Sequence, residues 1–117
     1  MKIRYRGPAV ELTVELRAHV ERQLSFVLSR FGERIGDVTV RVANTDGRQG
    51  STDKRCTLVV VLRPEGRVAV EDTDKELLVA VSHAAGRASR SVGRLLEREH
   101  GESRTPAARR TRSRPRR

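Results

Sequence analysis

The sequence predicts an α+β fold of order β-α-β-β-β-α, with two helices packed on one face of a four-stranded sheet. Three observations predict it: four segments alternate apolar and polar residues, two segments repeat apolar residues at helical spacing, and turn residues separate them. Two amphipathic helices on one sheet face would bury both of their apolar stripes. The chain of 117 residues is long enough for one domain with one core.

The first strand and the first helix are expected near the N-terminus. In residues 1–6, basic residues alternate with Ile3 and Tyr5, which is the pattern of a half-buried strand. Thr13 is predicted to cap the start of the helix and Gly32 to cap its end. The apolar face of this helix comprises Leu16, Val20, Leu24, Val27, Leu28 and Phe31.

Three strands are expected to follow the first helix. Residues 38–43 alternate valine with other residues and predict the second strand. Residues 55–63 predict a central strand, and a Pro-Glu-Gly turn separates it from a short fourth strand around Val68 and Val70. The polar segment Asn44–Asp53 is predicted as the hairpin loop between the second and third strands.

From about Thr73 the apolar spacing becomes helical and predicts the second helix. Asp74 and Glu76 are expected near its N-terminal end, where the helix dipole favours carboxylates. Gly86 and Gly93 each weaken a helix by about 1 kcal/mol, so tertiary packing must hold it. The apolar stripe comprises Leu77, Val81, Ala84, Ala85, Ala88, Val92, Leu95 and Leu96.

Residues 1–100 are predicted to form the folded domain, and residues 101–117 a disordered Arg-rich tail. This tail holds seven Arg and one Glu, and is too polar and self-repelling to fold alone. No apolar run approaches the roughly 20 residues that span a bilayer, and the first residues lack the apolar stretch of a secretion signal. The sequence therefore predicts a cytoplasmic protein with no membrane partner.

The charge is strongly basic, with 25 Lys and Arg against 15 Asp and Glu, which favours binding to phosphate polymers. In the second helix, four arginines at steps of three and four residues form a line on one side, with no acidic residue in the same sector. Guanidinium groups pair with phosphate through two hydrogen bonds, so this line predicts a phosphate-binding surface. The alternative is a stripe that only confers solubility. The four residues are Arg87, Arg90, Arg94 and Arg98.

A second basic set is expected on the sheet face that the helices leave open. Alternation along the strands directs these cations away from the helices, with Glu71 as the only acid expected among them. An ordinary solvated sheet face is an equally weighted alternative. Tyr5 and Phe31 are expected to be buried, so binding would depend on charge and shape rather than on base stacking. The set comprises Lys2, Arg4, Arg6, Arg41, Arg55, Arg63 and Arg67.

No arrangement of residues typical of catalysis is present in the sequence. The histidines His19, His83 and His100 lack the spacing of metal ligands. Cys56 is the only cysteine and lies in an apolar strand, which is typical of a core residue. The sequence therefore predicts a protein that is not an enzyme, with no cofactor, no metal and no small-molecule substrate.

One segment of the first helix is similar to a known family. The run Glu11-Leu12-Thr13-x-x-Leu16-Arg17-x-His19-Val20-x-Arg22-x-Leu24 resembles the first helix of the ribosome hibernation-promoting factor family, which includes the ribosome-associated inhibitor protein Y. The strand and helix order, the acidic segment Val70–Asp74 and the basic end of the second helix are similar too. The resemblance covers about residues 1–99, so the chain looks like a short form of the family, or a long form cut at its linker.

The resemblance implies a translation inhibitor that binds the small ribosomal subunit and its rRNA, occupies the mRNA and tRNA channel, and holds ribosomes inactive under stress. The free protein is predicted to be a monomer. The family commonly has an aromatic residue near Leu78 and an acid near Ser82, and this sequence has neither. The alternative is a nonspecific RNA- or DNA-binding chaperone or ribosome assembly protein that binds mainly through its tail. The predicted rRNA-binding residues are Arg22, Arg87, Arg90, Arg94, Arg98, Arg4, Arg6, Arg41 and Arg67.

Overall fold

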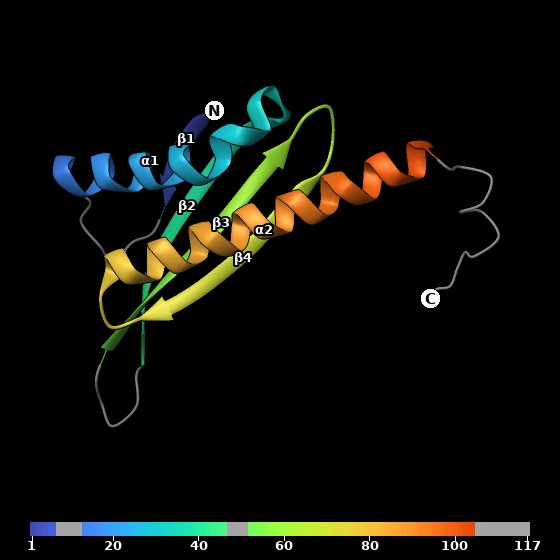
Figure 1. Cartoon of the computed structure of the whole chain (residues 1–117). Coiled ribbons are helices and arrows are strands. Elements are labelled where there is room, and N and C mark those ends of the chain that lie inside the picture. The colour runs from blue at the N-terminus through green and yellow to red at the C-terminus, as the bar shows by residue number, and fades with distance from the viewer. Residues whose placement is uncertain (7–12, 47–51, 105–117) are drawn as a thin grey trace.

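A computed structural model describes residues 1–6, 13–46 and 52–104. The predicted order β-α-β-β-β-α is confirmed, and Figure 1 shows both helices against one face of the sheet. The elements are β1 (Lys2–Arg6), α1 (Val14–Leu28), the 3-10 segment η1 (Ser29–Arg34), β2 (Ile35–Asp46), β3 (Thr52–Leu62), β4 (Arg67–Asp74) and α2 (Leu77–Arg104).

The four strands form one mixed sheet in the spatial order β1-β2-β3-β4. The first two strands run parallel, because the connection through α1 returns the chain to the end of the sheet where β1 began. The other neighbouring pairs are antiparallel hairpins. As a result β1 and β4 are the edge strands, and β4 lies beside α2 (Figure 1).

The core lies between the sheet and the two helices, as the apolar patterns predict. Alternate residues of β2 and β3 point toward the helices and are completely or almost completely buried. Four alanines of α2 take part in the contact, and their short side chains let this helix lie close to the sheet. The buried residues are Val20, Leu24, Leu28, Ile35, Val38, Val40, Val42, Cys56, Leu58, Val60, Leu62, Val68, Ala80, Val81, Ala84, Ala85, Ala88 and Val92.

The start of α1 is confirmed and its predicted end is wrong. The Thr13 hydroxyl accepts a hydrogen bond from the amide of Leu16 at 3.1 Å, as an N-cap does. The α-helix ends at Leu28 rather than at Gly32, because the chain tightens into the 3-10 turns of η1. Gly32 lies inside these turns with φ at +57°, a conformation that glycine adopts without strain.

The predicted hairpin loop Asn44–Asp53 is too long. The β2 and β3 strands stay paired from Asn44 and Lys54 out to Asp46 and Thr52, so the backbone ladder continues through this polar sequence. The Lys54 ammonium also donates a hydrogen bond to the Asn44 side-chain oxygen at 2.7 Å. Residues 47–51 lie outside the described residues.

The predicted start of α2 at Thr73 is also wrong. The fourth strand extends through Asp74, and α2 begins only at Leu77. Asp74 therefore lies at the end of β4, where its carboxylate accepts a hydrogen bond from the Glu76 amide at 2.9 Å. At its other end α2 continues to Arg104, four residues past the predicted domain boundary. The remainder of the predicted tail, residues 105–117, is outside the described part of the chain.

Close packing against α1 and η1 compensates for the weakening effect of Gly93 in α2. A Cβ atom on Gly93 would lie 3.4 Å from the Arg30 guanidinium and 3.8 Å from the Phe31 ring. One turn earlier, the Ser89 hydroxyl donates to the Val27 carbonyl at 3.0 Å. The two helices therefore meet at a place where α2 has small residues.

Arg34 connects the second half of α2 to η1 and β3 through hydrogen bonds and an ion pair. Its guanidinium donates to the Arg63 carbonyl at 2.5 Å and to the Glu99 carboxylate at 2.7 Å. The Arg63 amide in turn donates to the Arg34 carbonyl at 2.8 Å. These contacts join η1, the end of β3 and α2.

The docking of β1 on α1 can be tested through Tyr5, the only tyrosine in the chain. Its hydroxyl donates to the Glu21 carboxylate at 3.0 Å, and burial together with this bond raises the pKa of Tyr5 to about 12. An absorbance titration of the native protein should therefore give a midpoint near 12 instead of about 10.

The sign of the linkage follows from the raised pKa. Folding favours the protonated phenol, so the stability from this contact is complete below pH 10 and is lost as the pH rises toward 12. Glu21→Gln should lower the midpoint. A wild-type midpoint near 10 would mean that Tyr5 does not pack as described.

Candidate nucleic-acid interface

Three of the predicted arginines on α2 line one groove. Because the apolar stripe of α2 faces the sheet, Arg87, Arg90 and Arg94 project from the side of the helix that lies next to β4. The groove is open to solvent, has a volume of about 470 Å³ and separates the helix from the edge strand. All three arginines are exposed. Its other lining residues are Ala69, Val70, Glu71 and Ser91.

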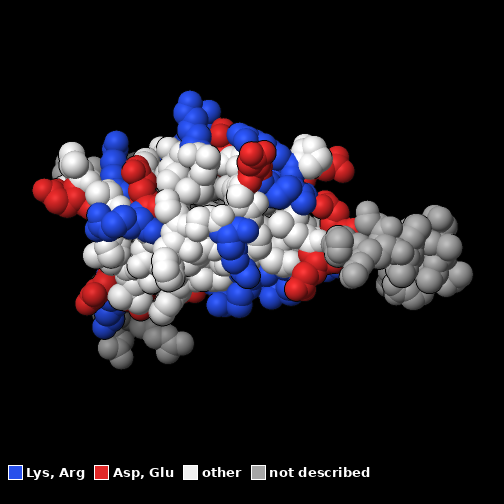
Figure 2. Space-filling view, turned by 45° about the horizontal axis from the view of Figure 1, so that its top comes forward, with Lys and Arg blue, Asp and Glu red and all other residues white. Residues whose placement is uncertain are grey.

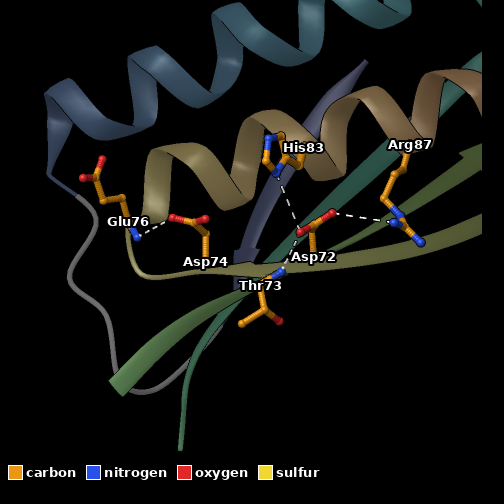
Figure 3. Close-up of polar contacts among 6 residues, drawn as sticks. All are labelled: Asp72, Thr73, Asp74, Glu76, His83 and Arg87. Carbon is orange, nitrogen blue, oxygen red and sulfur yellow. Dashed lines mark hydrogen bonds and ion pairs between the residues drawn. The ribbon is translucent and has the colours of Figure 1, made fainter. Parts of the chain in front are cut away.

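Asp72, at the edge of the sheet, lies between His83 and Arg87 (Figure 3). One carboxylate oxygen accepts from the Thr73 amide at 2.9 Å and lies 3.9 Å from the His83 Nδ1 atom. The other lies 3.7 Å from an Arg87 guanidinium nitrogen. This contact of Asp72 could not be predicted from the sequence, since it depends on β4 extending beneath α2.

Arg90 and Arg94 form no ion pair with any described carboxylate. Arg94 approaches the Ser91 hydroxyl at 3.4 Å, which leaves most of its donors free. Arg98 continues the line and is exposed, but it does not line the groove. Within the groove, the arginines that are most available to an anion are therefore Arg90 and Arg94.

Arg22 is exposed on α1, two residues after the buried Val20, and the groove does not include it. One turn further along α1, the Phe26 side chain is 85% exposed. This exposed ring could stack on a base, contrary to the prediction that binding depends on charge and shape alone. Tyr5 and Phe31, which were expected to be buried, are half-buried against the core.

The predicted cations of the sheet do lie on the face that the helices leave open, and all seven are exposed. They do not form a line, because threonine, valine and alanine fill the middle of that face. Arg4 is paired with Asp37 at 3.4 Å, so Glu71 is not the only acid on this face as predicted. The strand register places Arg6 beside Arg41, and Arg67 belongs to the opposite edge strand.

Figure 2 shows how charge is distributed over one face of the molecule. Lysines and arginines form several separate groups with acidic residues between them, and no single basic patch covers the view. The cationic character of the fold therefore depends on local arrangements such as the α2 line.

The buried thiol fits the structural role predicted for it. Cys56 is completely buried, and burial together with the Asp72 carboxylate raises the pKa of its thiol to about 12. The residues that the structure describes include no cluster of three His, Cys, Asp or Glu side chains able to hold a metal ion. No helix among them is long and apolar enough to cross a membrane.

Because Asp72 partly neutralises the charge of Arg87, removing the Asp72 charge tests whether Arg87 binds RNA, and another acidic residue can serve as a charge-matched control. Asp72→Asn removes the carboxylate charge beside Arg87 and keeps an oxygen that can accept from the Thr73 amide. Affinity for an RNA duplex at ~0.15 M salt should rise by about two- to five-fold, the effect of a partly exposed ion pair. The measurement is fluorescence anisotropy.

Glu33→Gln is the control, because it removes the same charge at an exposed position that forms no ion pair with a described cation and lies outside the predicted site. An equal gain in both variants would mean that net charge alone controls binding. An unchanged affinity in Asp72→Asn would show that Arg87 does not contact the duplex.

The fold and the groove together define a class: a small two-layer α+β domain that presents a line of arginines beside an open sheet edge. The family model described as sigma 54 modulation protein / S30EA ribosomal protein matches residues 3–100, and the chain belongs to this family. No curated protein matches the chain.

Solved structures agree with this assignment. The N-terminal domain of Thermus thermophilus protein Y is 28% identical, with a TM-score of 0.62 over 81% of this chain and 99% of that domain. A ribosomal subunit interface protein from Coxiella burnetii has a TM-score of 0.71 over 83% of this chain and 99% of its own. At 15% identity, the second comparison supports the fold alone. The resemblance predicted from the first helix is thereby confirmed.

Proposed function

We propose that this protein binds the small ribosomal subunit in the cytoplasm, occupies its mRNA and tRNA channel, and holds ribosomes inactive under stress. The chain belongs to a family whose description includes a ribosomal protein, and this supports the ribosome as its partner. The likeness to protein Y supports the same partner. The observation that carries the proposal is the line of exposed arginines on α2, in which Arg90 and Arg94 have no ion-pair partner among the described residues.

The spacing of these arginines suits a phosphate backbone. With a rise of 1.5 Å per residue, Arg87 and Arg90 are about 4.5 Å apart along the helix axis, and Arg90 and Arg94 about 6 Å. Each guanidinium can form two parallel hydrogen bonds to one phosphate. Such contacts do not distinguish bases, so folded rRNA would be recognised by the position of its phosphates.

Inhibition then requires no chemical step. A folded domain that fills the channel excludes mRNA and tRNA by its volume, and its cations occupy phosphates along the channel wall. In a channel walled by RNA, a bound protein faces phosphate on more than one side. This requirement gives a role to Arg22 on α1 and to the basic residues of the open sheet face, Arg4, Arg6, Arg41 and Arg67, as secondary contacts.

Charge reversal on α2 tests the proposal directly. The triple substitution of Arg87, Arg90 and Arg94 by Glu should abolish co-sedimentation with small subunits at ~0.15 M salt, because repulsion replaces attraction at the phosphates. The control variant, Arg55→Glu, Arg63→Glu and Lys75→Glu, changes the net charge equally at exposed positions outside the predicted site. It should retain most of the binding.

Circular dichroism should show that both variants are folded. If the α2 variant co-sediments like the wild type, the arginine line is not the binding surface. If both variants lose binding equally, net charge and not the placement of the arginines is responsible.

A second candidate, a nonspecific RNA- or DNA-binding chaperone, is favoured by one observation on the tail. Residues 105–117 contain six Arg and no acid, which is more than half of the net charge of +10. A chain truncated after Arg104 keeps α2 complete. It should still co-sediment with small subunits and still prevent mRNA binding. Loss of all binding on truncation would favour the chaperone.

A further inference from the structure

The outer edge of β4 carries unused backbone groups. In the hairpin between β3 and β4, the Leu62 amide donates to the Gly66 carbonyl at 2.9 Å. Residues of an antiparallel pair alternate in the direction of their hydrogen bonds, and the register continues through Val60 with Val68 and Leu58 with Val70. The even-numbered residues of β4 therefore bond to β3, and the odd-numbered residues direct their N–H and C=O groups outward.

Two other contacts agree with this alternation. The even-numbered residues of β3 bond to β4, so its odd-numbered residues should bond on the β2 side. The amide of Arg63, which follows β3 directly, does donate to the Arg34 carbonyl on that side. At the far end of β4, the outward amide of Thr73 donates to the Asp72 carboxylate. Along the groove itself, the outward amides of Ala69 and Glu71 have no hydrogen-bond acceptor among the described residues.

The groove thus has two kinds of binding group. Its floor is the open edge of β4 at Ala69 and Glu71, and its wall is the arginine line of α2. Among the described residues that line the groove, Glu71 has the only acidic side chain, and its register places that side chain on the sheet face away from the helices.

We propose that this groove binds an extended acidic peptide segment of another protein, which adds to β4 as a fifth strand. Outward N–H and C=O groups in alternation match the edge of another strand, whereas a phosphate backbone offers chiefly acceptors. Side chains that point to the same face of a strand repeat at about 6.6–6.8 Å, close to the axial rise of about 6 Å between Arg90 and Arg94. Aspartate or glutamate at alternate positions can therefore meet successive arginines.

Charge excludes two other occupants. A second copy of the chain paired through β4 would bring two arginine lines together. The segment 105–117 of this chain contains six arginines and no acid, so it would be repelled from the same wall. The partner must supply the negative charge.

This inference does not depend on ribosome binding, although both use the same arginines. The peptide and RNA would occupy the groove in turn, so an acidic protein segment could withdraw the protein from RNA. The two claims can fail separately, because one is tested with a peptide and the other with ribosomal subunits.

The test is amide hydrogen exchange of the full chain, read by NMR, with the acetylated and amidated peptide Val-Asp-Val-Asp-Val-Asp-Val as probe. Saturating peptide should slow exchange of the Ala69 and Glu71 amides at least tenfold. A peptide of the same sequence with every amide N-methylated keeps the charge and loses the backbone donors, and it should leave both amides unprotected. A peptide with Asn in place of Asp should bind at least tenfold more weakly.

Protein variants complete the test. Ala69→Pro removes one outward N–H without removing a bond to β3, and should abolish protection of the Glu71 amide. Ala69→Val keeps that N–H and should behave like the wild type. Equal protection by the methylated peptide, or none by the unmodified one, would overturn the proposal and leave an anion site that acts by charge alone, as for RNA.

Discussion

The packing of α2 on the sheet determines where its arginines lie and which groups they can contact. The alanine and valine stripe of this helix fits against β3 and β4, and this contact fixes the rotation of the helix about its axis. Because the rotation is fixed, the flank of the helix that carries the arginines must lie beside the edge of β4. Substituting a large residue for Ala84 or Ala88 would move the helix outward and displace the arginines from the groove.

Acidic residues partly neutralise the positive charge of both basic surfaces, the groove beside α2 and the open face of the sheet. Asp72 lies within ion-pair distance of Arg87 at one end of the groove, and Asp37 does the same for Arg4 on the open sheet face. These contacts are long and partly exposed, so each is worth only a fraction of a kcal/mol. They reduce the attraction for random polyanions and leave Arg90 and Arg94 as the strongest cationic pair of the groove. Under the proposed function, charge that is confined in this way helps the protein to distinguish one folded RNA from many anions.

The sequence was sufficient for the element order, the two apolar stripes and the faces of the strands, because these follow from local periodicity. It failed where tertiary contacts override local preference. The polar residues at Asn44 and Lys54 stay in the ladder because their neighbours pair, and Asp72 and Asp74 remain in a strand although their composition is typical of a helix start.

The candidate site was predictable only in part, for the same reason. The line of arginines follows from helical spacing, and so it was found. To predict the groove, one must know that β4 is an edge strand beside α2. The periodicity of apolar residues does not indicate the order of strands in a sheet. The contacts of Asp37 and Asp72, and the exposure of Phe26, likewise depend on neighbours that are distant in sequence.

The central claim is that Arg90 and Arg94 contact phosphate groups of the ribosome, and the salt dependence of binding measures this directly. The logarithm of the affinity for small subunits should fall linearly with the logarithm of salt concentration, with a slope of about 0.7–0.9 per phosphate contact. Replacing both arginines by alanine should reduce the magnitude of that slope by about 1.4–1.8. An unchanged slope in the double variant would contradict the account.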